Sequence, residues 1–210
     1  MRRSLLACLA VLAIPGLAGC GGGSARSDPT AQHSKLKPGP ADYAAPAQAN
    51  PPRPAPDFSL RNSLGRTVRL SQFRGKAVLL TFIYDHCPDT CPLIVGNLHA
   101  SLLQLGPRAS KLQIVAVSVD PRGDTPKTVK RFLALHDMTG RMEYLIGTKR
   151  ELARVWRKWG IAVQGTPDDR EVGHSAQVFG ITGSGRAATL YPADFKPRWI
   201  VHDVPVLAAH

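Results

Sequence analysis

The chain has 210 residues, of which 27 are Lys or Arg and 15 are Asp or Glu, so its formal net charge is +12. This length suits a single domain with a hydrophobic core. The basic residues are scattered and lack the interleaved aromatic residues or groove-reading motif of a nucleic-acid-binding protein, so we expect no nucleic-acid partner. A basic surface beside anionic lipid headgroups explains the charge more simply.

The N-terminal segment, residues 1–19, has the features of an export signal. A short basic start precedes the apolar stretch from Leu5 to Leu17, and Ala18 and Gly19 then lead to Cys20. This ending resembles the bacterial lipobox, which implies cleavage before Cys20 and lipidation of its sulfur; an ordinary signal peptide is the alternative. A transmembrane helix is disfavoured because the stretch is shorter than the roughly 20 residues that a bilayer requires. We therefore expect an exported protein, anchored by lipid to the outer face of the cytoplasmic membrane or in the periplasm.

The next segment, residues 20–53, is rich in Gly, Ala, Ser, Pro and Gln and has almost no large apolar residues. Such a composition predicts a disordered tether that holds a folded domain away from the membrane. We expect the domain to span residues 54–207.

Within the domain, strand patterns alternate with helix patterns. The expected elements are a short alternating strand at 67–70, a buried strand at 77–84, a helix at 92–105, a strand at 111–119, a helix that starts near Pro126, a strand at 143–146, a helix after the capping box 148–151, a hairpin of strands 174–181 and 186–191, and an amphipathic stretch at 196–204. This order indicates an α/β fold. The hairpin after parallel crossovers points to a thioredoxin-like arrangement, a central mixed sheet flanked by helices with a C-terminal β-hairpin.

Two thiols, Cys87 and Cys91, follow the buried strand 77–84 directly. Ligands of open α/β sheets bind at the carboxyl ends of strands, so this loop is where such a sheet presents its chemistry. A thioredoxin redox pair leaves two residues between its cysteines, whereas this pair leaves three. Four positions are about one helical turn, so both sulfurs can converge on one ion. Proline is tolerated at the first helical position, so we place the helix start at Pro92, with Cys91 as N-cap and the more strongly acidified thiol.

Several roles remain open for the pair. A structural disulfide would close a loop of about five residues and contribute only about 2 kcal/mol, so it is a weak explanation. Thiolates select soft or borderline ions, among which Cu(I) is favoured and zinc is also possible. If the leader is removed and Cys20 is acylated, Cys87 and Cys91 are the only thiols of the mature protein.

A third ligand is needed for tight coordination, and His174 is our candidate. It begins the predicted hairpin strand after the polar loop 164–173, and in a thioredoxin-like sheet this strand start lies beside the thiol loop. Gly173 before it allows close approach of the backbone. His86 adjoins Cys87, but adjacent side chains generally point apart, so it is the weaker choice.

Three separated motifs resemble the Sco/SenC family. Thr81–Pro92 is similar to the CPxxCP core of that family, Val117–Pro126 to its second signature and His174-Ser175 to its third. The resemblance implies a thioredoxin-like, membrane-tethered copper protein that helps assemble the copper A centre of cytochrome c oxidase, with the copper A subunit as partner. It also implies that Cys87, Cys91 and His174 are the copper ligands. The hairpin sequence 180–183 departs slightly from the family pattern, where an aspartate often precedes the turn.

Two functions of different classes follow. The first is a metallochaperone, not an enzyme, in which Cu(I) lies between the thiolates of Cys87 and Cys91 and Cu(II) adds His174. The second is a thiol–disulfide oxidoreductase in which Cys87 attacks and Cys91 resolves the mixed disulfide, reducing cysteines of the acceptor or of other exported proteins. A peroxidase is disfavoured because nothing distinguishes one cysteine as peroxidatic.

Overall fold

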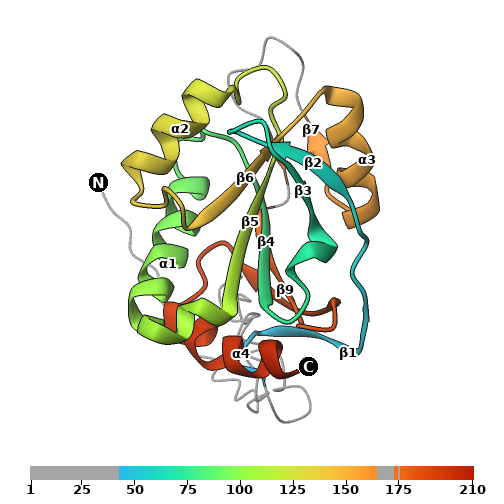
Figure 1. The fold of residues 1–210 in the computed structure, drawn as a ribbon, viewed down its shortest axis with the longest axis vertical. Helices are drawn as coiled ribbons and strands as arrows, with labels where there is room; N and C mark the ends of the chain where they lie inside the picture. The colour runs from blue at the N-terminus through green and yellow to red at the C-terminus, as the bar shows by residue number, and fades with distance from the viewer. Residues whose placement is uncertain (1–42, 165–172, 175) are drawn as a thin grey trace, which may run out of the picture. The chain divides into compact units, whose positions relative to one another are not determined.

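The centre of the sheet consists of three apolar strands, β4 (Ala77–Ile83), β5 (Leu112–Ser118) and β6 (Met142–Ile146). Every residue of β4 is buried in the computed structural model, which describes residues 43–164, 173–174 and 176–210. The three strands run parallel, and strands buried on both faces are typical of parallel sheets. Helices α1 (Thr90–Leu105) and α2 (Pro126–Leu135) make the two crossovers (Figure 1).

Antiparallel strands complete the sheet on both sides of this centre. The strand order is β1-β10-β9-β4-β5-β6-β2-β3. The remaining elements are β1 (Ala47–Pro54), β2 (Ser59–Asn62), β3 (Thr67–Arg69), the 3-10 turns η2 (Leu70–Phe73) and η3 (Gly106–Lys111), α3 (Lys149–Trp159), β7 (Val163–Gln164), β8 (Gly173–His174), β9 (Gln177–Ile181), β10 (Arg186–Pro192) and α4 (Pro197–Ala209). The hairpin β9–β10 lies beside β4. The predicted α/β, thioredoxin-like architecture with a mixed sheet and a C-terminal hairpin is confirmed.

Helices cover both faces of the sheet. Helices α1 and α2 lie on one side and α3 on the other (Figure 1). The predicted capping box of α3 is present: the Thr148 hydroxyl accepts the Glu151 N–H, and the Glu151 carboxylate accepts the Thr148 N–H at 2.8 Å. The buried face of α3 includes Trp159, whose ring contacts Phe82 of β4 and Phe179 of β9.

The predicted start of the domain at residue 54 is wrong. Residues 47–54 form β1, which pairs with β10 at the edge of the sheet, and Ala44 and Ala45 donate their N–H groups to the carboxylate of Asp203. An edge strand tolerates proline because one of its sides needs no ladder hydrogen bonds, so the proline-rich composition was misleading here. At the other end, α4 continues to Ala209, two residues past the predicted boundary.

Several predictions concern residues outside the described ranges. These are the leader 1–19, the lipidation site Cys20, the tether up to residue 42, the loop 165–172 and Ser175. Within the described ranges, no helix is both long enough and apolar enough to cross a membrane.

Candidate metal centre

Cys87 lies in the loop that joins β4 to α1 and Cys91 lies in the first turn of α1, at the carboxyl end of the parallel strands. Cys87 and Cys91 are both buried, and neither forms a disulfide. Helix α1 begins at Thr90, two residues earlier than predicted, because the Asp89 side chain accepts the Thr90 N–H and serves as the N-cap. Pro92 is the third residue of the helix. The first-turn N–H groups have no intrahelical acceptor, so proline costs little there.

The helix start determines which thiol is acidified. Cys91 is now inside the first turn, and its N–H donates to Sγ of Cys87 at 3.3 Å. A hydrogen bond from the Cys91 side chain, together with the N–H groups of Cys91 and Asp89, lowers the pKa of Cys87 to about 5 despite its burial. The same hydrogen bond and burial raise the pKa of Cys91.

The predicted order of the two thiols is therefore wrong. Sequence reasoning assigned the helix N-terminus mainly to Cys91, whereas its N–H groups point at Cys87. The outcome is a thiolate at Cys87 beside a protonated, buried thiol at Cys91 near neutral pH. A thiolate is both the nucleophilic and the metal-binding form of cysteine.

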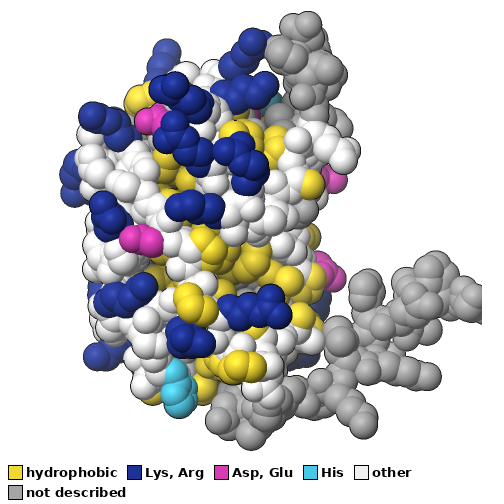
Figure 2. Space-filling model, turned by 90° about the vertical axis from the view of Figure 1, so that its right-hand side faces the viewer, with side chains coloured by type: hydrophobic (Ala, Val, Ile, Leu, Met, Phe, Trp, Pro, Cys, Tyr) yellow, Lys and Arg dark blue, Asp and Glu magenta, His cyan; other side chains and the backbone are white. Residues whose placement is uncertain are grey.

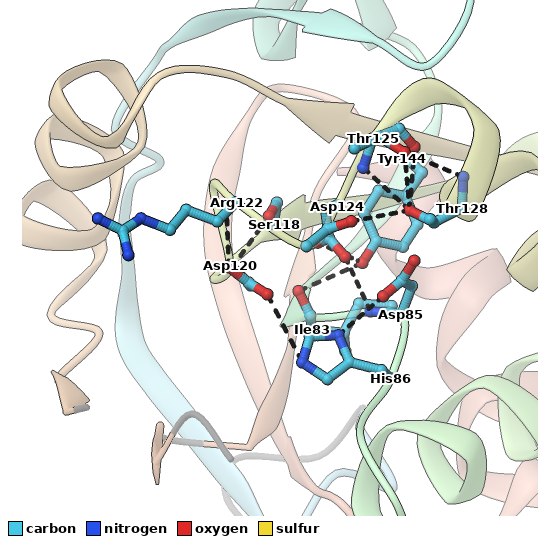
Figure 3. A network of polar contacts seen from close by, with 11 residues as sticks. Ile83, Asp85, His86, Ser118, Asp120, Arg122, Asp124, Thr125, Thr128 and Tyr144 are labelled. Carbon is cyan, nitrogen blue, oxygen red and sulfur yellow. Dashed lines mark hydrogen bonds and ion pairs between the residues drawn. The ribbon is translucent and has the colours of Figure 1, made fainter. Parts of the chain in front are cut away.

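A buried carboxylate, Asp124, is hydrogen-bonded to the loop that carries Cys87 (Figure 3). Its Oδ1 accepts the N–H of Asp85 at 2.9 Å, and its Oδ2 accepts the hydroxyl of Tyr144 at 2.8 Å. Burial raises the pKa of Asp124 to about 7, against the lowering effect of these hydrogen bonds. Sequence reasoning did not single out Asp124, which it included only within the motif Val117–Pro126. A tyrosine inside a buried strand, which needs a partner for its hydroxyl, was the available signal.

His86 is held by carboxylates rather than by the thiols. Its Nδ1 lies 2.9 Å from Oδ1 of Asp85 and its Nε2 lies 3.6 Å from Oδ2 of Asp120 (Figure 3). Its ring also packs edge-on against Tyr84, with 4.8 Å between the ring centres. The two ring nitrogens therefore face Asp85 of the thiol loop and Asp120 of the β5–α2 loop, which favours His174 as the third ligand.

The structure places the backbone of His174 in β8, paired with Val163 of β7. The predicted hairpin strand is thus shorter than expected, because β9 begins only at Gln177. The carbonyl of Gln177 accepts the hydroxyl of Thr81, near the carboxyl end of β4, at 3.0 Å. The three residues from His174 to Gln177 span at most about 11 Å. The backbone of His174 therefore lies near the carboxyl ends of the parallel strands, where the thiols lie.

The side chain of His174 lies outside the described part of the structure. Among the side chains that are described, no three His, Cys, Asp or Glu residues gather into a group that could hold a metal ion. The reason given for Gly173 does not hold, since a Cβ there would meet Gln164 only at an ordinary 3.7 Å.

Known proteins are similar to this chain in sequence and in fold. The protein SCO2 homolog of Bos taurus is 31% identical over 141 residues, which cover 64% of this chain and 52% of that protein. The chain thus spans about half the length of this relative. Among solved structures, Bradyrhizobium japonicum ScoI with copper bound is 28% identical, covers 73% of this chain and 98% of that one, and has a TM-score of 0.66. Apo Sco1 from Thermus thermophilus is 31% identical, with coverages of 77% and 95% and a TM-score of 0.67.

The family model described as SCO1/SenC matches residues 46–209, which include β1, both thiols, Asp124 and His174. The match therefore covers nearly all of the described fold. The chain belongs to the SCO1/SenC family.

Proposed function

We propose that this protein is a membrane-anchored copper metallochaperone that binds one copper ion through Cys87, Cys91 and His174 and helps assemble the copper A centre of cytochrome c oxidase. Cu(I) is held by the two sulfurs, and Cu(II) adds the imidazole of His174. The acceptor is the copper A subunit of the oxidase. The family implies this role, and the copper-bound state of Bradyrhizobium japonicum ScoI supports it.

The observation that carries the proposal is the state of the thiol pair. Neither thiol forms a disulfide, and hydrogen bonds from the side chain and the backbone of Cys91 lower the pKa of Cys87 to about 5, which favours its thiolate at neutral pH. Metal binding must displace the proton of only one further sulfur, that of Cys91, which lies one helical turn away. The backbone of His174 reaches the same edge of the sheet through β8 and the start of β9.

We further propose that the leader is removed and that lipidated Cys20 anchors the domain to the outer face of the cytoplasmic membrane or in the periplasm. Residues 21–42 then separate the lipid from the first described residue. At most about 3.5 Å per residue, this stretch reaches on the order of 75 Å, enough to present the thiol loop to a membrane-embedded acceptor.

Anaerobic titration of the reduced chain with Cu(I), followed by Cu(II) absorption spectroscopy, tests the proposal. One copper should bind per chain, with sulfur-to-Cu(II) charge transfer. Cys87→Ser and Cys91→Ser should each abolish tight binding, and His174→Ala should weaken Cu(II) binding. His86→Ala is the matched control, because His86 is next to Cys87 but contacts carboxylates, and it should keep the copper. Unchanged copper affinity in Cys87→Ser would refute the proposal.

A second function, thiol–disulfide exchange, is favoured by the unequal pKa values of the thiols. The Cys87 thiolate would attack a disulfide of the acceptor and release one acceptor thiolate. Cys91, after losing its proton, would attack Sγ of Cys87 in the mixed disulfide and release the second. The acceptor gains two electrons, and Cys87 and Cys91 end as a disulfide.

His174→Ala separates the two functions. Under the metallochaperone proposal this variant loses Cu(II) retention, while the rate of dithiol reduction of a model disulfide stays close to that of the unaltered chain. A variant that keeps its copper and loses reduction would reverse the assignment.

A further inference from the structure

Helix α3 carries an unusual concentration of positive charge on one surface. Five of its eleven residues are Lys or Arg, and Glu151 is its only acidic residue. The cations are Lys149, Arg150, Arg154, Arg157 and Lys158, all of them exposed. Figure 2 shows the side of the molecule on which α3 lies, where Lys and Arg side chains spread over the surface with few Asp or Glu among them.

The charge is confined to the outward arc of the helix. At 100° per residue, the five cations fall on one half of the helical circumference, and the buried residues Leu152, Val155, Trp156 and Trp159 fall on the other. The buried half is fixed against the sheet, since Trp156 donates its indole N–H to the carbonyl of Ser118 at 3.0 Å. The helix therefore presents a rigid basic strip about 16 Å long.

These cations have little within the protein to neutralise them. In the described ranges, the Arg ion pairs join Arg66 to Glu143 and Arg69 to Asp57, and no α3 cation takes part in an ion pair. Lys158 donates to the carbonyl of Asp57 at 3.1 Å. A strip of unpaired cations attracts an external polyanion.

We propose that the outward face of α3 docks on an anionic lipid surface. A protein partner would need an apolar anchor at the centre of its contact, because interface cores are depleted in charge and held by large apolar side chains. The large apolar side chains exposed in the described ranges are Leu64, Leu93, Leu103 and Leu135, none of which belongs to α3. A lipid surface needs no such anchor, since each Lys or Arg adds its own attraction to the headgroups.

Docking through α3 would also orient the thiol loop. Helix α3 starts directly after β6, at the carboxyl edge of the sheet, and runs back along its face (Figure 1). With α3 flat on the membrane, the carboxyl ends of the parallel strands, and the thiol loop with them, face sideways along the membrane surface and not away from it. The inference rests on the proposed membrane location and does not depend on copper binding.

Partitioning onto vesicles tests the proposal with the full chain carrying Cys20→Ser, which prevents lipidation. The probes are vesicles of phosphatidylcholine alone and of phosphatidylcholine with phosphatidylglycerol, at low and high salt. The test variant reverses three α3 charges: Arg150→Glu, Arg154→Glu and Arg157→Glu. The matched control makes the same charge change on α2, on the other side of the sheet: Lys127→Glu, Lys130→Glu and Arg131→Glu.

The α3 variant should lose partitioning onto anionic vesicles on the order of 100-fold, while the α2 control loses far less. Binding to phosphatidylcholine alone, where the leader contributes equally, should not change, and high salt should remove the difference. Equal losses in both variants would mean that partitioning depends only on net charge. No loss in the α3 variant would mean that the basic face of α3 does not bind lipid and is a surface for an acidic protein instead. Either result overturns the proposal. Circular dichroism checks folding, and copper titration of the same variants tests the metallochaperone function separately.

Discussion

Two regions of this protein contain the same pair of side chains, a buried aspartate bonded to a buried tyrosine. At the thiol loop, Asp124 accepts the hydroxyl of Tyr144 at 2.8 Å. At the start of β1, Asp203 of α4 accepts the hydroxyl of Tyr191, also at 2.8 Å. Both carboxylates also accept backbone N–H groups from a segment distant in sequence. The two pairs nevertheless have different roles in the structure.

Asp203 has the richer set of donors. Besides Tyr191, the N–H groups of Ala44 and Ala45 and Nδ1 of His202 lie within hydrogen-bonding distance of its oxygens. Asp124 receives one N–H from the thiol loop, and burial raises its pKa to about 7. Asp203 thus holds the segment that precedes β1 against α4. Asp124 supports a reactive loop and can change its protonation near neutral pH.

The largest effect that separates the pairs is expected from Asp203→Ala. This change leaves the Ala44 and Ala45 N–H groups and the Tyr191 hydroxyl without their acceptor, so unfolding free energy should fall by about 3–5 kcal/mol. Urea unfolding measures it. Asp194→Ala, at an exposed aspartate near the same helix, should stay within about 0.5 kcal/mol of the unaltered chain. Copper stoichiometry should not change, and a loss confined to copper binding would contradict the structural role.

The second effect is a pH dependence that Asp124→Asn removes. Because the folded pKa of Asp124, about 7, exceeds its ordinary value of 3.8, the folded state binds more protons between these values, and this group lowers stability as pH rises through that window. At about 1.4 kcal/mol per pKa unit, the change approaches 4 kcal/mol. Unfolding free energy of the Asn variant, relative to the unaltered chain, should therefore increase from pH 4 to pH 7.

The comparison must be made as a difference, because Cys87 acts in the opposite sense. Its folded pKa, about 5, is lower than its ordinary value of 9.0, so this thiol adds stability as pH rises from 5 to 9. The two slopes partly cancel in the unaltered chain. A difference between the Asn variant and the unaltered chain that does not vary with pH would show that Asp124 is ionised throughout.

Sequence patterns predicted the features that depend on neighbouring residues. The apolar runs of β4 and β5, the capping box at Thr148 and the thiol loop were all found within one or two residues. These features arise from local backbone preferences and burial, which a single segment encodes.

The remaining features depend on partners far along the chain. Strand β1 is held by β10 and Asp203, more than 130 residues away, so its proline-rich composition alone predicted disorder. The order of the thiol pKa values depends on where the N–H groups at the start of α1 point, and a shift of two residues in the helix start reversed it. The Asp124–Tyr144 bond crosses from one βα loop to the next strand.

A third effect concerns the Cys87 thiolate, in the loop to which Asp124 is hydrogen-bonded. Cys91→Ala removes the side-chain hydrogen bond that contributes most to the acidity of Cys87, so the pKa of Cys87 should rise from about 5 by at least about one unit, or 1.4 kcal/mol. Ultraviolet absorbance of the thiolate, followed against pH in the reduced, metal-free chain, measures it. Cys91→Ser keeps a donor and should raise the pKa less. An unchanged Cys87 pKa in both variants would assign the acidity to the backbone N–H groups instead.

The smallest effect is expected from Gly123→Ala, beside Asp124. A Cβ there would lie 2.2 Å from Oδ2 of Asp120 and 2.8 Å from Cε1 of His86, so both side chains must move. Because each can rotate toward solvent, the cost should be only about 1 kcal/mol of unfolding free energy. Gly96→Ala in α1, where a Cβ meets nothing within 4 Å, should instead stabilise the chain by up to about 1 kcal/mol. If Gly123→Ala proved as harmless as Gly96→Ala, the contact of His86 with Asp120 would contribute nothing to holding the thiol loop. The support of that loop would then rest on Asp124 and Tyr144 alone.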